Sequence, residues 1–188
     1  MEQDTLQVGN LYHGDCLELM PFIPSKSIDM ILCDLPWLYG TTACKWDTII
    51  PFEPLWKEYK RIIKDNGAIV LTASQPFTSA LVMSNPGWFK YCWYWIKERP
   101  VNVLQIKKRA GKNVEDVLVF YEGQCKYYPQ KTEYGGTLRT NKIKNGSLGK
   151  LIDSGNKRAV FYRDDRTRYP LQTIYFQRDI LTSNLHPT

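Results

Sequence analysis

Short apolar runs and a segment of helical periodicity alternate between residues 28 and 121, and this alternation constrains the fold more than any other feature of the sequence. The apolar runs are brief, nearly continuous and rich in β-branched or aromatic residues, which is typical of strands buried in a sheet. We predict strands at 28–33, 68–74, 89–97 and 117–121, and helices at 53–64 and 77–84. This order predicts an α/β fold with a mainly parallel sheet.

The segments around this central region are less regular. Residues 8–13 form a short extended candidate, and residues 16–23 have the pattern of a short helix. Asp65-Asn66-Gly67 is the predicted stop of the helix that precedes the second strand. Residues 124–170 are rich in Lys, Asn, Gly and Tyr, which indicates an irregular or short-stranded insertion. Short strands are predicted near 159–163 and 172–177.

Length and cysteine usage exclude several classes of protein. A chain of 188 residues is long enough for one domain with a single core. No run approaches ~18 consecutive apolar residues, so we expect no transmembrane helix. The polar, acidic start differs from a secretory signal peptide, so we expect a cytoplasmic protein. The five cysteines form no C-x-x-C pair, and His13 and His186 lie at opposite ends, so we expect reduced thiols and no metal site.

Positive charge is concentrated in the second half of the chain. The net charge is +6, but residues 97–168 hold 17 Lys and Arg against 8 Asp and Glu, whereas the rest of the chain holds 8 against 11. A basic segment attached to a slightly acidic body is typical of nucleic-acid-binding proteins. The alternative is an ordinary basic surface that keeps the protein soluble, and charge alone leaves both open.

The tetrapeptide Asp34-Leu35-Pro36-Trp37 directly follows the strand predicted at 28–33. Ligands of open α/β sheets bind at the carboxyl ends of the strands. Pro36 has no N–H and biases Leu35 toward an extended conformation, so backbone carbonyls can face a ligand. A carboxylate, carbonyl oxygens and an aromatic ring together suit a planar heterocycle with an exocyclic NH2 group. The alternative is a strand-ending turn whose Trp37 packs into the core.

The tetrapeptide and its surroundings resemble a known family. LYHGDCLELMPFIPSKSIDMILCDLPW is similar to the opening G-D…S-x-D-x-I-x-x-D-P-P-Y of the amino-methyltransferases of DNA, which methylate adenine N6 or cytosine N4. Their catalytic tetrapeptide is D/N/S-P-P-Y/F/W, so Leu35 stands where the first proline is usual. The blocks NGAIVLTASQPF, FKYCWYWIKERP and DVLVFYEG resemble the family's later blocks, and the resemblance covers about residues 8–123.

The order of these blocks resembles the circularly permuted group called β. It implies a catalytic part at 1–123, a target-recognition-like region at 124–180 and, with LHPT, the start of a further block at 181–188. The implied fold is a partial Rossmann-like methyltransferase sheet, mostly parallel, with helices on both faces. The family's full sheet has seven strands in the order 3-2-1-4-5-7-6.

The resemblance implies transfer of a methyl group from S-adenosylmethionine to the exocyclic amine of a base flipped out of the duplex. Asp34 would accept one N–H bond of the amine and the backbone carbonyl of Leu35 the other, so that orientation supplies much of the acceleration. Trp37 would stack on the base, which is worth roughly 1–3 kcal/mol. A leading aspartate favours adenine N6 as the target.

The resemblance also assigns binding residues. Gly14, Asp15 and Asp34 would contact the cofactor, although a Gly-Asp pair after a strand is also an ordinary turn. Contacts to double-stranded DNA would come from Lys107, Lys108, Arg109 and Lys112, and from Arg139, Lys142, Lys144, Lys157 and Arg158. The alternative for each of these cations is solvated surface charge.

The Gly-rich loop of the family's cofactor-binding half is not found in this sequence. None of the twelve glycines occurs as G-x-G. Two strands of the family's sheet would then be missing between 8–13 and 28–33, and the latter strand would have a bare apolar edge that favours association. The chain is then a naturally shortened gene of a phage or mobile element, part of a longer protein, or half of a split enzyme. We expect the chain alone to bind S-adenosylmethionine weakly or not at all.

Three functions stay open on the sequence. The first is a DNA adenine methyltransferase of the restriction-modification kind, in which this chain supplies the catalytic part. The second is a non-catalytic DNA-binding remnant, or one subunit of a split methyltransferase that needs a homodimer or a complementary cofactor-half chain. The third is a methyltransferase that acts on RNA or on protein amides.

Overall fold

The computed structural model describes residues 6–36, 47–133 and 167–175. The chain divides into two compact units, the first formed by Met1–Tyr127 with Gln172–Thr188 and the second by Tyr128–Leu171. None of the described helices is long and apolar enough to cross a membrane. Within the same ranges, His, Cys, Asp and Glu side chains form no group of three that could hold a metal ion.

The first unit is built on a five-stranded sheet in the order β1-β2-β4-β3-β7. Its strands are β1 Ile28–Asp34, β2 Ile63–Ala73, β3 Phe89–Ile96, β4 Val114–Phe120 and β7 Thr173–Tyr175. Its helices are α1 Cys16–Leu19, α2 Phe52–Ile62 and α3 Phe77–Ser84, with 3-10 turns η1 Met20–Phe22 and η2 Val103–Gln105. Each strand and helix predicted between residues 28 and 121 is therefore present, in the predicted order.

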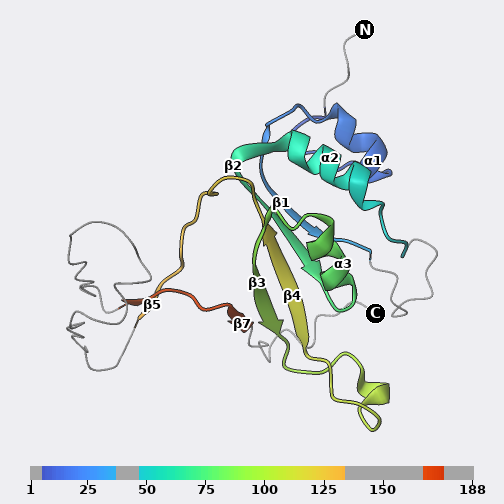
Figure 1. Ribbon diagram of the computed structural model, residues 1–188, viewed down its shortest axis with the longest axis vertical. Helices are drawn as coiled ribbons and strands as arrows, with labels where there is room; N and C mark the ends of the chain where they lie inside the picture. Colours follow the sequence, from blue (N-terminus) through green and yellow to red (C-terminus); the bar gives the residue numbers. More distant parts are fainter. Residues whose placement is uncertain (1–5, 37–46, 134–166, 176–188) are drawn as a thin grey trace. The chain divides into compact units, whose positions relative to one another are not determined.

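Strand β4 runs against the other described strands of this sheet. β1 pairs in parallel with β2, and β3 with β7, whereas β4 pairs antiparallel with both β2 and β3. Figure 1 shows β3 and β4 as neighbouring arrows that point in opposite directions. Four of the five described strands thus point the same way, which confirms the mostly parallel α/β sheet. The order β1-β2-β4-β3 also reproduces 4-5-7-6 of the order expected from the resemblance.

Strand β2 begins directly after α2, so the stop predicted at Asp65-Asn66-Gly67 is wrong. The pairing of β1 with β2 shifts register between Ile28 and Met30, and the extra residues of β2 form a bulge there. A Cβ atom at Gly67 would lie 2.8 Å from the carbonyl oxygen of Asp29. Gly67 is therefore required by the close approach of β1 to the bulge, and not by the end of a helix.

One face of the sheet packs against the helices and forms the core. The α2 stripe that faces the sheet is Leu55, Trp56, Tyr59 and Ile62, and α3 adds Phe77 and Leu81. These side chains form one cluster with Ile69 and Leu71 of β2 and with Leu118 and Phe120 of β4. The Trp56 ring lies 4.9 Å from that of Phe120, and its indole N–H donates a 2.7 Å hydrogen bond to Ser84 Oγ. This cluster joins α2, α3 and the middle of the sheet.

The opposite face of the sheet is apolar but has no described helix over it. On β1, Met30 and Leu32 are 57% and 66% exposed, whereas Ile31 and Cys33 pack against the core. The strand predicted as buried at 28–33 is therefore buried on one side only. Helices on both faces were expected, and the described residues place them on one. The reason is the connectivity, because successive right-handed crossovers from β1 to β2 and from β2 to β3 return to the same face.

Residues 8–13 do not form the predicted strand. Val8 and Gly9 lie in a turn in which Gly9 has φ +85°, and the side chains of Val8 and Leu11 are exposed. No described strand pairs with this segment, so it gains no ladder hydrogen bonds from the described sheet and can turn. The strand predicted near 172–177 is confirmed as β7, and the helix predicted at 16–23 is confirmed as α1 and η1. The strand predicted near 159–163 lies outside the described residues.

The described part of the second unit is a short antiparallel pair. Strand β5, Thr132–Glu133, pairs with β6, Thr167–Arg168. The ammonium of Lys131 lies 4.9 Å from the centre of the Tyr169 ring, in the range of a cation–π contact. These short strands agree with the short-stranded insertion predicted for 124–170.

Candidate active site

Asp34 is the last residue of β1 and lies at the carboxyl end of the parallel strands. Its side chain is exposed on the face of the sheet opposite the helices. Thr72 lies directly across on β2, and its hydroxyl donates a short hydrogen bond to Asp34 Oδ1. This bond orients the carboxylate, and no side chain in the described ranges hydrogen-bonds its second oxygen, Oδ2.

Leu35 turns the chain back toward the core. Its side chain is only 3% exposed and belongs to the core cluster, whereas Pro36 is half-buried. Leu35 therefore anchors the turn by burial, whereas a proline at this position would stiffen the turn by its fixed φ. The alternative interpretation of the tetrapeptide placed Trp37 in the core. Trp37 lies outside the described residues, and the described core side chain of the tetrapeptide is Leu35.

The row of side chains that contains Asp34 continues across the sheet. The register places Asp34 beside Thr72, Thr72 beside Val117 and Val117 beside Trp93. Trp93 and its neighbour Tyr91 have ring centres 6.3 Å apart on the same face. At about 4.8 Å per strand, Trp93 lies about 14 Å from Asp34. The carboxylate thus stands at one end of a row whose other end is aromatic.

Sequence reasoning missed Thr72. It was assigned only to a buried strand, and its pairing with Asp34 depends on the parallel register. The available signal was a polar residue near the carboxyl end of an otherwise apolar strand, next to a strand that ends in a carboxylate. Such a position faces the ligand-binding edge of an α/β sheet.

Gly14 and Asp15 serve the local structure of α1. The Asp15 carboxylate caps the helix by accepting a 2.8 Å hydrogen bond from the backbone N–H of Leu17. A Cβ atom at Gly14 would lie 3.2 Å from the Leu19 side chain. The absence of a side chain at Gly14 therefore leaves room for Leu19 of α1. Burial, and then the nearby Asp15 carboxylate and Cys33 thiol, raise the pKa of the Cys16 thiol at the start of α1.

The cysteine thiols in the described part of the chain are poor nucleophiles at neutral pH. Cys16, Cys33, Cys92 and Cys125 are free thiols. Burial raises the pKa of the Cys33 thiol, and burial together with the charge of Asp116 raises the pKa of Cys92 to about 11. A thiol with a raised pKa stays protonated at neutral pH and is a poor nucleophile.

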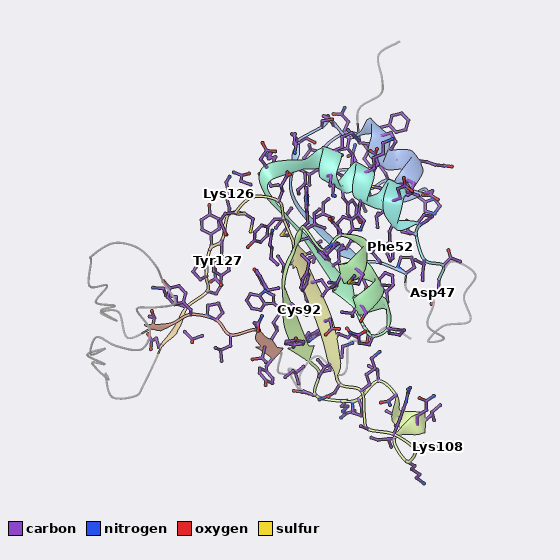
Figure 2. The ribbon with its side chains drawn as sticks, viewed as in Figure 1. Asp47, Phe52, Cys92, Lys108, Lys126 and Tyr127 are labelled. Atoms are coloured by element: carbon purple, nitrogen blue, oxygen red, sulfur yellow. The ribbon has the colours of Figure 1, made fainter. Side chains whose placement is uncertain are left out.

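The first group of predicted DNA-binding cations lies on one loop. Residues 97–113 connect β3 to β4, and Figure 2 shows Lys108 on this loop beyond the ends of the two strands. Lys107, Lys108 and Arg109 are exposed, and Lys112 is half-buried. Because β3 runs in the same direction as β1, the loop leaves the sheet at the same end as Asp34.

Lys97 begins this loop, but its charge is already engaged. Its ammonium pairs with Glu115 of β4 and lies 4.6 Å from the centre of the Trp95 ring. The second group of predicted cations, Arg139, Lys142, Lys144, Lys157 and Arg158, lies outside the described residues. The structure therefore brings the first cation group and Asp34 to one end of the sheet and does not test the second.

The described residues fit S-adenosylmethionine only in part. Asp34 offers one carboxylate oxygen that no described residue hydrogen-bonds, but the Asp15 carboxylate is engaged as a helix cap. Within the described ranges, α2 and α3 begin at Phe52 and Phe77, each preceded by a proline, so neither presents a glycine loop at its N-terminus. The described residues therefore supply only some of the polar contacts that S-adenosylmethionine needs.

Known proteins resemble parts of this chain. The chain matches no family model and no curated protein. Among solved structures, it is 18% identical to PvuII DNA methyltransferase (cytosine-N4-specific), with a TM-score of 0.48, covering 64% of this chain and 51% of that one. The M1.HpyAVI-SAM complex is 20% identical, with a TM-score of 0.47 and coverage of 77% and 70%. TTHA0409 from Thermus thermophilus is 15% identical, with a TM-score of 0.44 and coverage of 62% and 54%. The chain spans about half the length of the first of these, and its function has to be inferred from its own residues.

Proposed function

We propose that this chain is the catalytic part of a DNA amino-methyltransferase that prefers adenine N6. The observation that carries the proposal is the exposed Asp34 at the carboxyl end of β1, oriented by the Thr72 hydroxyl and followed by the buried Leu35. This places a fixed acceptor in the tetrapeptide D-L-P-W, which resembles the family's catalytic tetrapeptide. A methyl-transfer assay on mixed-sequence duplex DNA tests the proposal.

Asp34 and Leu35 act on the exocyclic amine of an extruded base. The amine is a poor nucleophile because its lone pair is delocalised into the ring. Asp34 Oδ2 accepts one N–H, and the backbone carbonyl of Leu35 accepts the other, which favours a pyramidal nitrogen and exposes its lone pair. S-adenosylmethionine supplies the electrophilic methyl group when it is bound. On methyl transfer the amine would lose one proton, and Asp34 Oδ2 is placed to accept it along the N–H hydrogen bond.

Trp37 completes the base-binding part of the proposal. Its ring would stack on the extruded base, and a stacked base–aromatic pair is worth roughly 1–3 kcal/mol. That gain offsets part of the few kcal/mol required to unstack a base from the duplex. Gly14 and Asp15 are proposed to lie on the cofactor side of the site. We place the protein in the cytoplasm, in a restriction-modification or phage setting.

The exposed cations of the β3–β4 loop are proposed to contact the phosphates of double-stranded DNA, together with Lys112 and the second cation group at 139–158. Removing Lys107, Lys108 and Arg109 by substitution with Gln should therefore weaken binding and flatten its salt dependence. Each phosphate contact contributes about 0.9 to the slope of log K against log salt, so the triple variant should lower the slope by about 2–3. Fluorescence anisotropy with a labelled duplex at several salt concentrations measures it.

The matched control removes cations from α2. Lys57→Gln with Lys60→Gln changes surface charge away from the loop, and should leave the slope nearly unchanged. Equal slopes for the wild type and the triple variant would contradict phosphate contacts by this loop.

A subunit of a split methyltransferase is a second candidate, and a specific observation favours it. Met30 and Leu32 leave an apolar face exposed on β1, and no described strand pairs with the outer edge of β1. Strands of parallel sheets are normally covered on both faces. A complementary chain that carries the cofactor-binding half, or a second copy of this chain, would cover this surface. Catalysis by Asp34 is common to both candidates, whereas a purely DNA-binding remnant would not need the carboxylate.

A further inference from the structure

The β3–β4 loop presents an apolar tip as well as positive charge. Leu104 is 99% exposed at the 3-10 turn η2, and Val103 and Ile106 beside it are 62% and 49% exposed. Figure 1 shows the loop extending beyond the ends of β3 and β4, and Figure 2 places Lys108 on it. Apolar side chains held in water at a projecting tip indicate a surface that is buried when a partner binds.

The tip is held in place by an ordered network. Asn102 closes the loop, since its Nδ2 donates to the carbonyl of Ala110 at 3.0 Å and its Oδ1 accepts from the N–H of Lys112 at 2.6 Å. The N–H of Val101 donates to the carbonyl of Lys112 at 2.8 Å, which joins the two sides of the loop. A Cβ atom at Gly111 would lie 3.0 Å from Pro100, so the two sides also pack closely. The ordered structure of the loop therefore keeps Leu104 exposed.

Charge identifies the chemistry of the partner. Residues 99–113 contain five Lys and Arg and no Asp or Glu. Exposed Lys107, Lys108 and Arg109 follow the tip directly, so an apolar wedge and cations for phosphates lie on one short loop. Proteins that kink or unstack DNA use this combination, with an apolar side chain inserted between base steps and cations on the backbone. The loop also leaves the sheet at the end where Asp34 is exposed.

We infer that Leu104 is a wedge that inserts between base pairs of duplex DNA and opens the stack beside the target base. The inference rests on the proposed function in one respect, that duplex DNA is the substrate. It adds a positioning residue for base extrusion and separates two tasks within the loop. The cations bind the duplex, and Leu104 deforms it.

Plasmid unwinding tests this inference without knowledge of the target sequence or the methyl donor. A relaxed plasmid is incubated with the protein and topoisomerase I, and the change in linking number per bound protein is read on a gel. Insertion between base steps unwinds the duplex, so the wild type should shift the linking number. Leu104→Ala should reduce the shift at saturation by at least about fivefold, because alanine is too short to part a base step. Leu104→Phe should retain it.

Leu11→Ala is the matched control, because Leu11 is also fully exposed and lies outside the loop. It should unwind the plasmid as the wild type does, and the thermal midpoints of all three variants should equal that of the wild type. A wild type that binds the plasmid without changing its linking number, or a Leu104→Ala protein that unwinds it fully, would overturn the wedge and leave the proposed function standing. A wild type that does not bind duplex DNA would overturn both.

Discussion

Asp34→Ala is expected to lower methyl transfer to mixed-sequence duplex DNA by about 100-fold or more while DNA binding is kept. The substitution removes the acceptor that holds the amine and orients its lone pair, and single preorganised groups of this kind are worth factors of about 100 to 1000. The proposed phosphate contacts come from other residues, so the affinity for DNA should not fall. Transfer of a labelled methyl group and anisotropy with the same duplex measure the two quantities.

Two further variants show that the effect belongs to the position of the carboxylate. Thr72→Val removes the hydroxyl that orients Asp34 and should cost about tenfold in transfer, as the loss of one hydrogen bond to a charged group predicts. Asp29→Ala removes another carboxylate of β1, which pairs with Lys64, and should leave transfer unchanged. An Asp34→Ala protein with wild-type transfer would remove the carboxylate from the mechanism.

Leu71→Ala is expected to destabilise the fold by about 2–5 kcal/mol, which is a large part of a typical domain's stability. Leu71 is completely buried between the sheet and the helices, and its neighbours in register are Cys33 and Leu118. Leu32→Ala, one residue before Cys33 on β1, should cost less than about 1 kcal/mol because Leu32 is 66% exposed. Urea unfolding of the two variants compares the two faces of the sheet with the same substitution.

The outcome shows whether the sheet is packed on the helix side only or is buried on both faces. Different midpoints with equal slopes would agree with a sheet that is packed on the helix side only. An equal loss for both variants would contradict it and would show that the Met30 and Leu32 face is buried in solution, for instance by a second copy. In that case, dilution should lower the stability of the wild type, since a dimer dissociates on dilution.

The regular elements of the central region could be predicted from the sequence because their hydrophobic patterns are strong. The amphipathic stripe of α2 and the apolar runs of β2 and β4 each point to one structure. The start of β2 could not be predicted, because Asp65-Asn66-Gly67 has the composition of a helix stop. Its extended conformation comes from pairing with β1 across the sheet, and Gly67 is retained for the close approach to Asp29. The strand predicted at 8–13 was wrong because a strand needs a partner to pair with. The local sequence pattern does not show whether a partner is present.

The candidate site was predictable where its residues are consecutive and unpredictable where they meet through the fold. Asp34 follows directly from the position of β1, and the strand end is where α/β sheets place ligands. Thr72 reaches Asp34 only through the register of β1 with β2, and the burial of Leu35 depends on the helices beneath. The apolar tip at Leu104 could not be predicted either. The charge pattern identifies Lys107, Lys108 and Arg109, but the exposure of the apolar residues before them depends on the folded loop.

The identity of the modified nucleoside tests the central claim most directly. Unmethylated mixed-sequence duplex DNA is incubated with the chain at millimolar S-adenosylmethionine, digested, and analysed by mass spectrometry for N6-methyladenine and N4-methylcytosine. We predict N6-methyladenine, at a yield that rises in proportion to the donor concentration because the described residues fit the donor only in part. A folded chain that binds the duplex yet leaves every nucleoside unmethylated at all donor concentrations would contradict the proposal that this chain carries out methyl transfer.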